Sequence, residues 1–365
     1  MFLIPDFKFA TGVPFSSSFN FEPPSLDASI PTFNEGDSVA VASGTWLGGQ
    51  NTLVYLQSSG IGNLLNPLTS WVLPARIPIC MLVSPRGGPE DTEPHRLDPI
   101  QVDFLIKLPG LNSLSLTGKD FGELNGIWAK SIETRDCLAV LLKGEPPSRV
   151  SDGLSKPFRT KETSLFENRD WIQMRNGYRD RFTFLEELLP YFDANDIKIA
   201  TTGFTSRELF ALGDSPSNLY CQGAMGCASL IGLGISKTSK KRVLVLDGEG
   251  ALLMRPSALA SIGLCSDPDL WHFVLDNSSY ASTGGQQTHS TEFDLCRAAL
   301  GFGYQVAVET TCYDSSLDKY LNSFQGPKFI RVFVHSSHKP KSRVPLSLSS
   351  NTWRLREFIK SLSHF

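Results

Sequence analysis

Residues 242–288 read RVLVLDGEGALLMRPSALASIGLCSDPDLWHFVLDNSSYASTGGQQT, and this stretch decides the fold class. One apolar run ends at Asp247, just before Gly248-Glu249-Gly250, and a second ends at Asp276-Asn277. Apolar runs without alternation are typical of strands buried on both faces of a parallel sheet. The segment between the two runs predicts a helix. This order of elements indicates an α/β fold, in which ligands bind beyond the carboxyl ends of the strands.

The residues that follow these two strands suit a diphosphate and a metal ion. Gly248 and Gly250 let the backbone approach a diphosphate closely, and helix N-terminal amides favour its charge. The carboxylate of Glu249, the amide oxygen of Asn277 and a nearby backbone carbonyl are hard oxygen ligands that suit Mg²⁺. The alternative is a glycine turn between two core strands.

The rest of the chain extends the α/β pattern to two domains. Its 365 residues exceed what one ordinary core needs. Further apolar runs predict strands, and longer segments between and after them predict helices, which indicates doubly wound parallel sheets. Residues 144–170 are rich in Pro, Ser and charge and predict a linker. We therefore expect a first domain over 1–150, a linker over 151–175 and a second domain over 176–365. The expected strands are 53–57, 77–84, 137–143, 197–201, 242–247, 271–276 and 328–334, and the expected helices include 182–192, 291–301 and 352–363.

Composition narrows the function classes. The chain is 41% hydrophobic and 19% charged, with a net charge of −3, so we expect no nucleic-acid partner and no membrane span. Its seven cysteines are scattered and include no CxxC pair, which indicates reduced thiols rather than zinc ligands. The N-terminus lacks the basic and continuous apolar regions of a signal peptide. A cytoplasmic enzyme is expected.

The 242–288 run resembles the cofactor-binding domain of thiamine-diphosphate-dependent phosphonopyruvate decarboxylases, which carry DGDGALLMR, LDN and STGGQ-like stretches. The segment TTGFTSRELFALGDSPSNLYCQGAMGCASLIGLG at 201–234 is similar to the stretch that opens the same domain, and the resemblance covers about residues 9–335 in order. It implies the thiamine-diphosphate-binding fold, with a pyrimidine-binding and a diphosphate-binding domain and no middle domain. It also implies thiamine diphosphate and Mg²⁺ as cofactors.

The same resemblance implies which residues hold these cofactors. The residues that it places on thiamine diphosphate are Gly203, Met225, Gly248, Gly250, Ala251, Ser282 and Thr283, and those on Mg²⁺ are Glu249, Asn277 and Ser279. Thr201 and Thr202 would lie near the diphosphate, and Met225 would support the bent form of the cofactor. The family has Asp where this chain has Glu249. Because Mg²⁺ requires tight octahedral geometry, the longer side chain must be absorbed by a shift of backbone or metal, or affinity falls.

The first domain supplies the remaining candidates. Asn34-Glu35-Gly36-Asp37 resembles the family's Asn-Glu-Gly-Asp motif, whose Glu activates the cofactor through its aminopyrimidine ring, and Glu35 is the match. The alternative is an exposed carboxylate stabilised by a helix dipole. In a loop after the strand that ends near Ser84, His95 could donate a proton to the product carbanion and Arg86 could pair with an anionic substrate. Ser59 is also expected to contact the substrate. The alternative for His95 is a solvated histidine without a catalytic role.

The resemblance implies the decarboxylation of a small anionic 2-oxo acid, 3-phosphonopyruvate, to phosphonoacetaldehyde and CO₂, as in phosphonate and antibiotic biosynthesis. Three alternatives stay open: a sulfopyruvate decarboxylase, a catalytically weakened or regulatory homologue because of Glu249, and a carboligase, against which the absence of a middle domain weighs. In the family the cofactor lies between two chains. Glu35 and Glu249 would then meet only in a homodimer or higher homo-oligomer.

Overall fold

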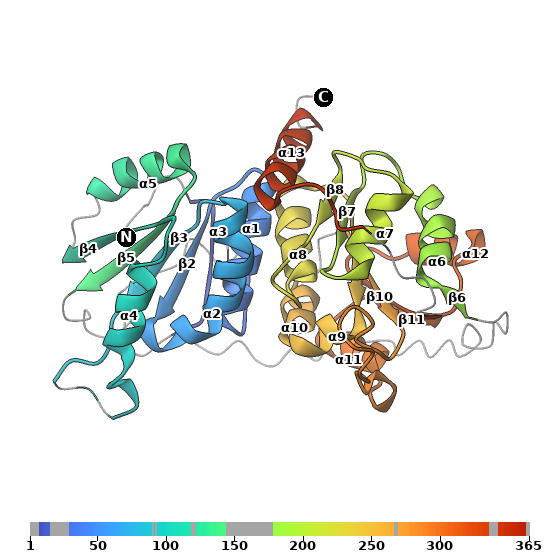
Figure 1. Cartoon of the computed structure of the whole chain (residues 1–365), viewed down its shortest axis with the longest axis horizontal. Helices are drawn as coiled ribbons and strands as arrows, with labels where there is room; N and C mark the ends of the chain where they lie inside the picture. Colours follow the sequence, from blue (N-terminus) through green and yellow to red (C-terminus); the bar gives the residue numbers. More distant parts are fainter. Residues whose placement is uncertain are drawn as a thin grey trace.

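The chain folds into two parallel β-sheets, each covered by helices, which lie side by side in Figure 1. The computed structural model describes residues 7–14, 29–89, 91, 93–117, 122–143, 178–265, 269–335 and 342–362. The two sheets confirm the predicted doubly wound α/β class. The linker predicted over 151–175 and the first two residues of the predicted second domain lie outside the described residues, so the domain boundaries stay predictions. No helix among the described residues is both long and apolar enough to cross a membrane.

The first sheet has the strand order β1-β2-β3-β5-β4, and every neighbouring pair is parallel. Its strands are β1 (Phe9–Gly12), β2 (Thr52–Gln57), β3 (Cys80–Ser84), β4 (Leu111–Thr117) and β5 (Cys137–Lys143). Its helices are α1 (Glu35–Leu47), α2 (Ile61–Pro67), α3 (Leu73–Ala75), α4 (Asp98–Ile106) and α5 (Gly122–Thr134).

The second sheet has the order β11-β12-β10-β9-β7-β8, is also parallel, and pairs the short β6 with β12. Its strands are β6 (Arg179–Asp180), β7 (Ile197–Ala200), β8 (Asn218–Tyr220), β9 (Val243–Gly248), β10 (Leu270–Asp276), β11 (Val306–Thr310) and β12 (Lys328–His335). Its helices are α6 (Arg181–Leu188), α7 (Phe204–Leu212), α8 (Ala228–Ser239), α9 (Glu249–Met254), α10 (Ser257–Leu264), α11 (Leu295–Phe302), α12 (Ser315–Asn322) and α13 (Leu348–Ser361).

The strands expected from the sequence are all present, and the strands that it missed include those at the two ends of each sheet. These end strands are β1, β4, β8 and β11. In β11, buried positions alternate with partly exposed ones, and in β4 the two buried residues Leu111 and Leu116 are separated by four more exposed positions. Both patterns arise because part of an end strand meets solvent. The central strand β10 is instead buried at every position. A continuous apolar run in the sequence therefore predicts the central strands of a parallel sheet better than its end strands.

Two helices differ from their expected bounds because a capping residue sets their start. Helix α11 begins at Leu295 rather than 291, after Asp294, whose side chain accepts a hydrogen bond from the Arg297 amide at 2.9 Å. Helix α13 begins at Leu348 rather than 352, after the cap Ser347, whose Oγ accepts from the Ser350 amide at 3.1 Å. The N-terminal end of α11 is thus shorter than expected and that of α13 is longer, although both helices were predicted in the right part of the sequence.

Helix α1 of the first half packs closely against helix α8 of the second half (Figure 1). A Cβ atom added at Gly44 of α1 would lie 2.1 Å from the Ile231 carbonyl oxygen, and one at Gly234 of α8 would lie 2.4 Å from the Val41 carbonyl oxygen. The two backbones can approach this closely only because both crossing positions are glycine. One hydrophobic cluster contains buried residues of both helices, so the two halves share a core.

At this crossing, Gly44 has no room for a side chain. We expect Gly44→Ala to lower the free energy of unfolding by about 1–3 kcal/mol, as overpacking of a core does. A Cβ at Gly126 of α5 would meet nothing within 4 Å, so Gly126→Ala is the matched control and should stabilise the protein by roughly 0.5–1 kcal/mol. Thermal and urea unfolding of the two variants measures the difference. Equal effects of the two substitutions would contradict the close crossing.

Candidate functional site

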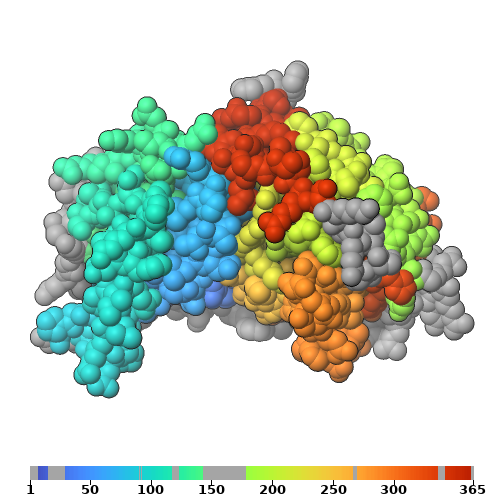
Figure 2. Space-filling view, viewed as in Figure 1, coloured from blue at the N-terminus to red at the C-terminus, as the bar shows by residue number. Residues whose placement is uncertain are grey.

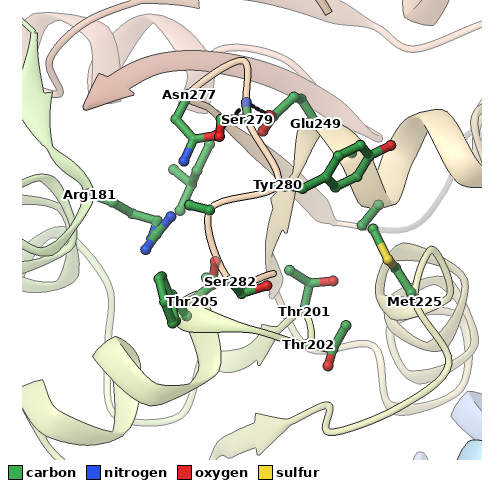
Figure 3. A pocket seen from close by; sticks show the side chains of 16 residues that line it. Arg181, Thr201, Thr202, Thr205, Met225, Glu249, Asn277, Ser279, Tyr280 and Ser282 are labelled. Atoms are coloured by element: carbon green, nitrogen blue, oxygen red, sulfur yellow. Dashed lines mark hydrogen bonds between the residues drawn. The ribbon is translucent and has the colours of Figure 1, made fainter. Parts of the chain in front are cut away.

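A cavity opens at the carboxyl ends of strands β7, β9 and β10 (Figure 3). Its lining comes entirely from the second half of the chain, between residues 181 and 282. The lining residues are Arg181, Thr201, Thr202, Phe204, Thr205, Met225, Gly248, Glu249, Gly250, Ala251, Leu275, Asn277, Ser279, Tyr280, Ala281 and Ser282. The position matches the strand ends at which parallel α/β sheets bind ligands.

Glu249 begins α9, and its side chain turns toward the loop after β10. Its Oε1 accepts hydrogen bonds from the Ser279 amide at 2.9 Å and from the Thr288 hydroxyl at 3.1 Å. The residue is only 3% exposed, and burial, together with the negative charge of Asp276, raises the pKa of Glu249 to about 7. A cation beside this carboxylate would favour its ionised form.

A strained turn brings Asn277 to the same place. The Ser279 amide that binds Glu249 also donates to Asn277 Oδ1 at 3.0 Å, so the two oxygen-bearing side chains converge. Ser278, which stands between Asn277 and Ser279 in the chain, has φ +56°, a conformation that non-glycine residues rarely adopt. Buried Asp276 stabilises this turn: its Oδ1 accepts from the Ser278 amide at 2.9 Å, and its Oδ2 accepts from both Nη2 and Nε of Arg331 at 2.7 and 2.9 Å.

The glycines of the Gly248-Glu249-Gly250 motif have different roles. A Cβ at Gly250 would lie 2.4 Å from the Tyr280 ring, so packing within the protein requires glycine there. A Cβ at Gly248 would meet nothing within 4 Å, and this residue lines the cavity. Gly248 therefore leaves room for a ligand to approach the backbone.

The opposite side of the cavity is formed by the turn that carries Met225 (Figure 3). Ala224, just before it, has φ +48°, which is again unusual for a residue with a side chain. Gly223 is packed so tightly that its Cβ would lie 2.0 Å from the Ser70 carbonyl oxygen of the first half. The Ala224 amide also donates to Ser70 Oγ at 2.9 Å, so the first half of the chain supports this turn from behind.

Gly203 and Thr283 do not line the cavity but adjoin Ser282, which does. Gly203 has φ +102°, and its Cβ would lie 3.3 Å from Ser282 Oγ. The Thr283 hydroxyl donates to the Tyr280 carbonyl at 3.0 Å. Both residues therefore shape the loop around Ser282.

Together these groups fit a Mg²⁺–diphosphate ligand. Glu249 and Asn277 offer a carboxylate and an amide oxygen that share one amide donor, and Ser279 adds a backbone carbonyl to the same turn. Among the described residues no group of three or more His, Cys, Asp or Glu side chains could hold a metal ion on its own. One carboxylate with neutral oxygens suits a Mg²⁺ ion that keeps positions for phosphate oxygens.

Glu35 lies in the first half and does not line this cavity. It begins α1, after the cap Asn34, and its Oε2 accepts a hydrogen bond from Asn63 Nδ2 at 2.7 Å. A Cβ at Gly60 would lie 2.3 Å from Glu35 Oε1, so the carboxylate rests directly on a glycine. The position of the Glu35 side chain therefore depends on the absence of a side chain at Gly60.

His95 and Arg86 lie at the same end of the first sheet and share contacts through Ser58. The Arg86 amide donates to Ser58 Oγ at 2.8 Å, and Ser58 Oγ donates to Asp98 Oδ2 at 2.7 Å. His95 Nδ1 is 3.6 Å from that same carboxylate oxygen. These contacts place the predicted proton donor and the predicted substrate arginine together.

The Arg86 guanidinium is engaged with Asp91, to which its Nε donates at 2.8 Å. This pair, with the Gly87 amide, lowers the pKa of Asp91 to about 2. Ser59 lies nearby, and its Oγ accepts from Gln57 Nε2 at 2.5 Å. The structure thus brings Ser59, Arg86 and His95 to one region of the first half, separate from the cavity lining.

Arg255 connects the two motifs that the sequence singled out. It follows α9, and its Nη1 donates to Asp37 Oδ1 at 2.7 Å and to Asn34 Oδ1 at 3.1 Å, both in the first turn region of α1. A Cβ at Gly36 would lie 2.7 Å from the same nitrogen. The helix that begins with Glu249 is thereby tied to the helix that begins with Glu35.

Sequence reasoning missed Arg181, Thr205 and Tyr280, which also line the cavity. Arg181 follows a segment without a recognisable motif, and its partner Glu208 is 27 positions away. No local pattern of residues could have identified it.

Comparisons with known proteins find similar sequences and a similar fold. Residues 209–332 match the family model described as thiamine pyrophosphate enzyme, C-terminal TPP binding domain. The chain is 34% identical over 313 residues to a phosphonopyruvate decarboxylase of Streptomyces viridochromogenes, covering 82% of this chain and 77% of that protein. It is 27% identical over 358 residues to a sulfopyruvate decarboxylase of Methanosarcina acetivorans, covering 90% and 87%. A thiamine diphosphate-dependent 4-hydroxybenzoylformate decarboxylase of Rhodococcus jostii has a similar fold, with a TM-score of 0.67, 14% identity and coverage of 90% and 96%.

Proposed function

This chain belongs to the phosphonopyruvate decarboxylase family, and from that premise we propose that it converts 3-phosphonopyruvate to phosphonoacetaldehyde and CO₂ with the help of Mg²⁺. Membership makes the chain a thiamine-diphosphate-dependent 2-oxo acid decarboxylase, a carbon–carbon lyase. The observation that carries the proposal is the convergence of Glu249 and Asn277 on the Ser279 amide at the strand ends. The cytoplasmic location expected from the sequence is part of the proposal.

Each residue that the sequence predicted at the cofactor or the metal ion receives a role from its position. Bound thiamine diphosphate supplies the electron sink for loss of CO₂. Glu249, Asn277 and the Ser279 carbonyl hold Mg²⁺, and Gly248, Gly250, Ala251 and Ser282 surround the diphosphate, with Gly203 and Thr283 shaping that loop. Met225 supports the rings from the opposite side of the cavity (Figure 3).

The first half supplies the groups that act on the reacting atoms. In the proposal the Glu35 carboxylate binds the ring nitrogen of the aminopyrimidine, His95 delivers a proton to the product carbon, and Arg86, with Ser59, binds the substrate anion. The cavity lining contains none of these residues. This separation supports an active site that is completed by the first half of a second copy, in a homodimer or larger oligomer.

Sulfopyruvate is the second candidate substrate. The Methanosarcina sulfopyruvate decarboxylase aligns with more of this chain than the Streptomyces enzyme does, although at lower identity. Both acids carry an anionic group beyond the 2-oxo acid, which Arg86 could pair with in either case. The two substrates differ only in this distal group, which is a phosphonate in one and a sulfonate in the other, so both need much the same site.

The deciding experiment follows the aldehyde by phosphorus NMR after incubation with thiamine diphosphate, Mg²⁺ and phosphonopyruvate. We expect cofactor-dependent phosphonoacetaldehyde, and we expect Glu35→Gln to reduce turnover by about 10²–10⁴-fold while cofactor affinity is retained. Turnover of sulfopyruvate alone would replace the substrate. Cofactor binding without turnover of either acid would favour a regulatory homologue, and near-normal turnover by Glu35→Gln would remove Glu35 from the mechanism.

The contact between Glu35 and Gly60 gives a second prediction. In Gly60→Ala the new methyl group occupies the place of the Glu35 carboxylate, so we expect turnover to fall at least about tenfold with little change in cofactor affinity. Gly62→Ala is the matched control, because its Cβ would meet only Gln101 Oε1 at 3.8 Å. Equal activity of the two variants would show that the position of Glu35 does not matter.

The length of Glu249 can be tested directly. In Glu249→Asp the Ser279 amide retains Asn277 Oδ1 as a partner, so we expect Mg²⁺ affinity to be kept or increased. Glu249→Gln keeps the length but loses the charge and should weaken Mg²⁺ binding at least about tenfold. Titration of Mg²⁺ at saturating thiamine diphosphate, followed by tryptophan fluorescence, measures both. If Asp abolishes binding, the site requires the longer arm.

A further inference from the structure

We propose that Arg181 binds the terminal phosphate of the cofactor through Nη1 and that Glu208 positions it for this contact. The inference deepens the proposed function and rests on it only in placing thiamine diphosphate in the cavity. Neither the sequence motifs nor the resemblance assigned a role to Arg181.

The guanidinium of Arg181 is held in one orientation. Its Nε and Nη2 donate to the two carboxylate oxygens of Glu208 at 2.5 and 2.9 Å, which forms a bidentate pair between α6 and α7. The Arg181 side chain is 7% exposed and that of Glu208 is fully buried. Bidentate pairing fixes the plane of a guanidinium, and it occupies only two of the three nitrogens. Among the described residues, no hydrogen bond from Nη1 is found.

The location of Arg181 indicates what Nη1 faces. Arg181 lines the cavity, and Figure 3 shows it on the same side as Asn277, with Met225 on the opposite side. If Asn277 and Glu249 hold the metal and the diphosphate while Met225 supports the rings, Arg181 lies at the end farthest from the reacting carbon. It is therefore placed to bind the cofactor and not the substrate.

Charge gives an independent reason for a cation at this end. Mg²⁺ neutralises only part of the charge of a diphosphate together with an ionised Glu249. Arg331, on strand β12, is already paired with Asp276 and Glu309. A buried ion pair is also a poor way to hold two helices together, because apolar side chains would do so without desolvation of charges. A pair that opens onto an anion-binding cavity has a use that a purely structural pair lacks.

The test compares thiamine diphosphate with thiamine monophosphate, which lacks the terminal phosphate. The double variant Arg181→Gln/Glu208→Gln removes both charges of the ion pair together. We expect its affinity for thiamine diphosphate, measured calorimetrically with Mg²⁺, to fall roughly ten- to hundredfold, as for loss of a charge-assisted hydrogen bond. Its affinity for thiamine monophosphate should not change.

The matched control is Arg354→Gln/Asp214→Asn, which removes a bidentate pair of the same domain outside the cavity lining. This control should lower the melting temperature of the apoprotein and leave both affinities unchanged. If the Arg181 double variant does not fold, Arg181→Lys, which keeps the charge but loses the planar fork, is measured with the same two ligands and should weaken only the diphosphate.

Equal losses for the two ligands, or no loss for either, would overturn the assignment and leave the pair a link between α6 and α7. Failure of the proposed substrate has a different outcome: the wild type would bind thiamine diphosphate, the variants would discriminate as expected, and phosphonopyruvate would not be consumed. A wild type that binds neither ligand would overturn both.

Discussion

The crossing of α1 over α8 is the constraint on which the arrangement of the two halves depends. At Gly44 and Gly234 the two helices meet backbone to backbone, and no larger residue fits at that distance. Each helix also begins at a functional segment: α1 starts with Glu35, and α8 starts two residues after Gly226, in the turn that carries Met225. A fixed crossing therefore sets where both segments lie.

A second link acts close to those functional segments. Arg255 leaves the end of α9 and binds Asp37 and Asn34 at the start of α1. Since α9 begins with Glu249 and is only six residues long, the proposed metal ligand and the proposed catalytic Glu35 belong to helices that are tied by one arginine. A shift of α9 would therefore be transmitted through Arg255 to the start of α1, and a shift of α1 would be transmitted to α9.

The sequence predicted the central strands and both glycine-containing motifs, and the reasons are physical. Strands such as β10 are buried on both faces, so their composition alone identifies them. The end strands β1, β4, β8 and β11 were missed because they are short or partly solvated. Arg181 was missed for another reason: the contact with Glu208 exists only after α6 and α7 pack, and nothing in the sequence around either residue announces it. The environment of Glu249 was equally out of reach, because its raised pKa arises from burial and from Asp276 on a neighbouring strand.

The contacts of Glu249 explain how the chain accommodates Glu at a position where the family has Asp. The extra methylene lets Oε1 accept hydrogen bonds from Ser279 and Thr288, so the longer side chain is accommodated by polar partners and not left unsatisfied. The buried pairs Arg331–Asp276, Arg255–Asp37 and Arg181–Glu208 support the surrounding segments. Buried ion pairs contribute little stability compared with apolar packing, but they hold side chains in defined directions. The Arg331–Asp276 pair lies beside the strained turn at Ser278, which indicates that this turn is organised for geometry at some cost in stability.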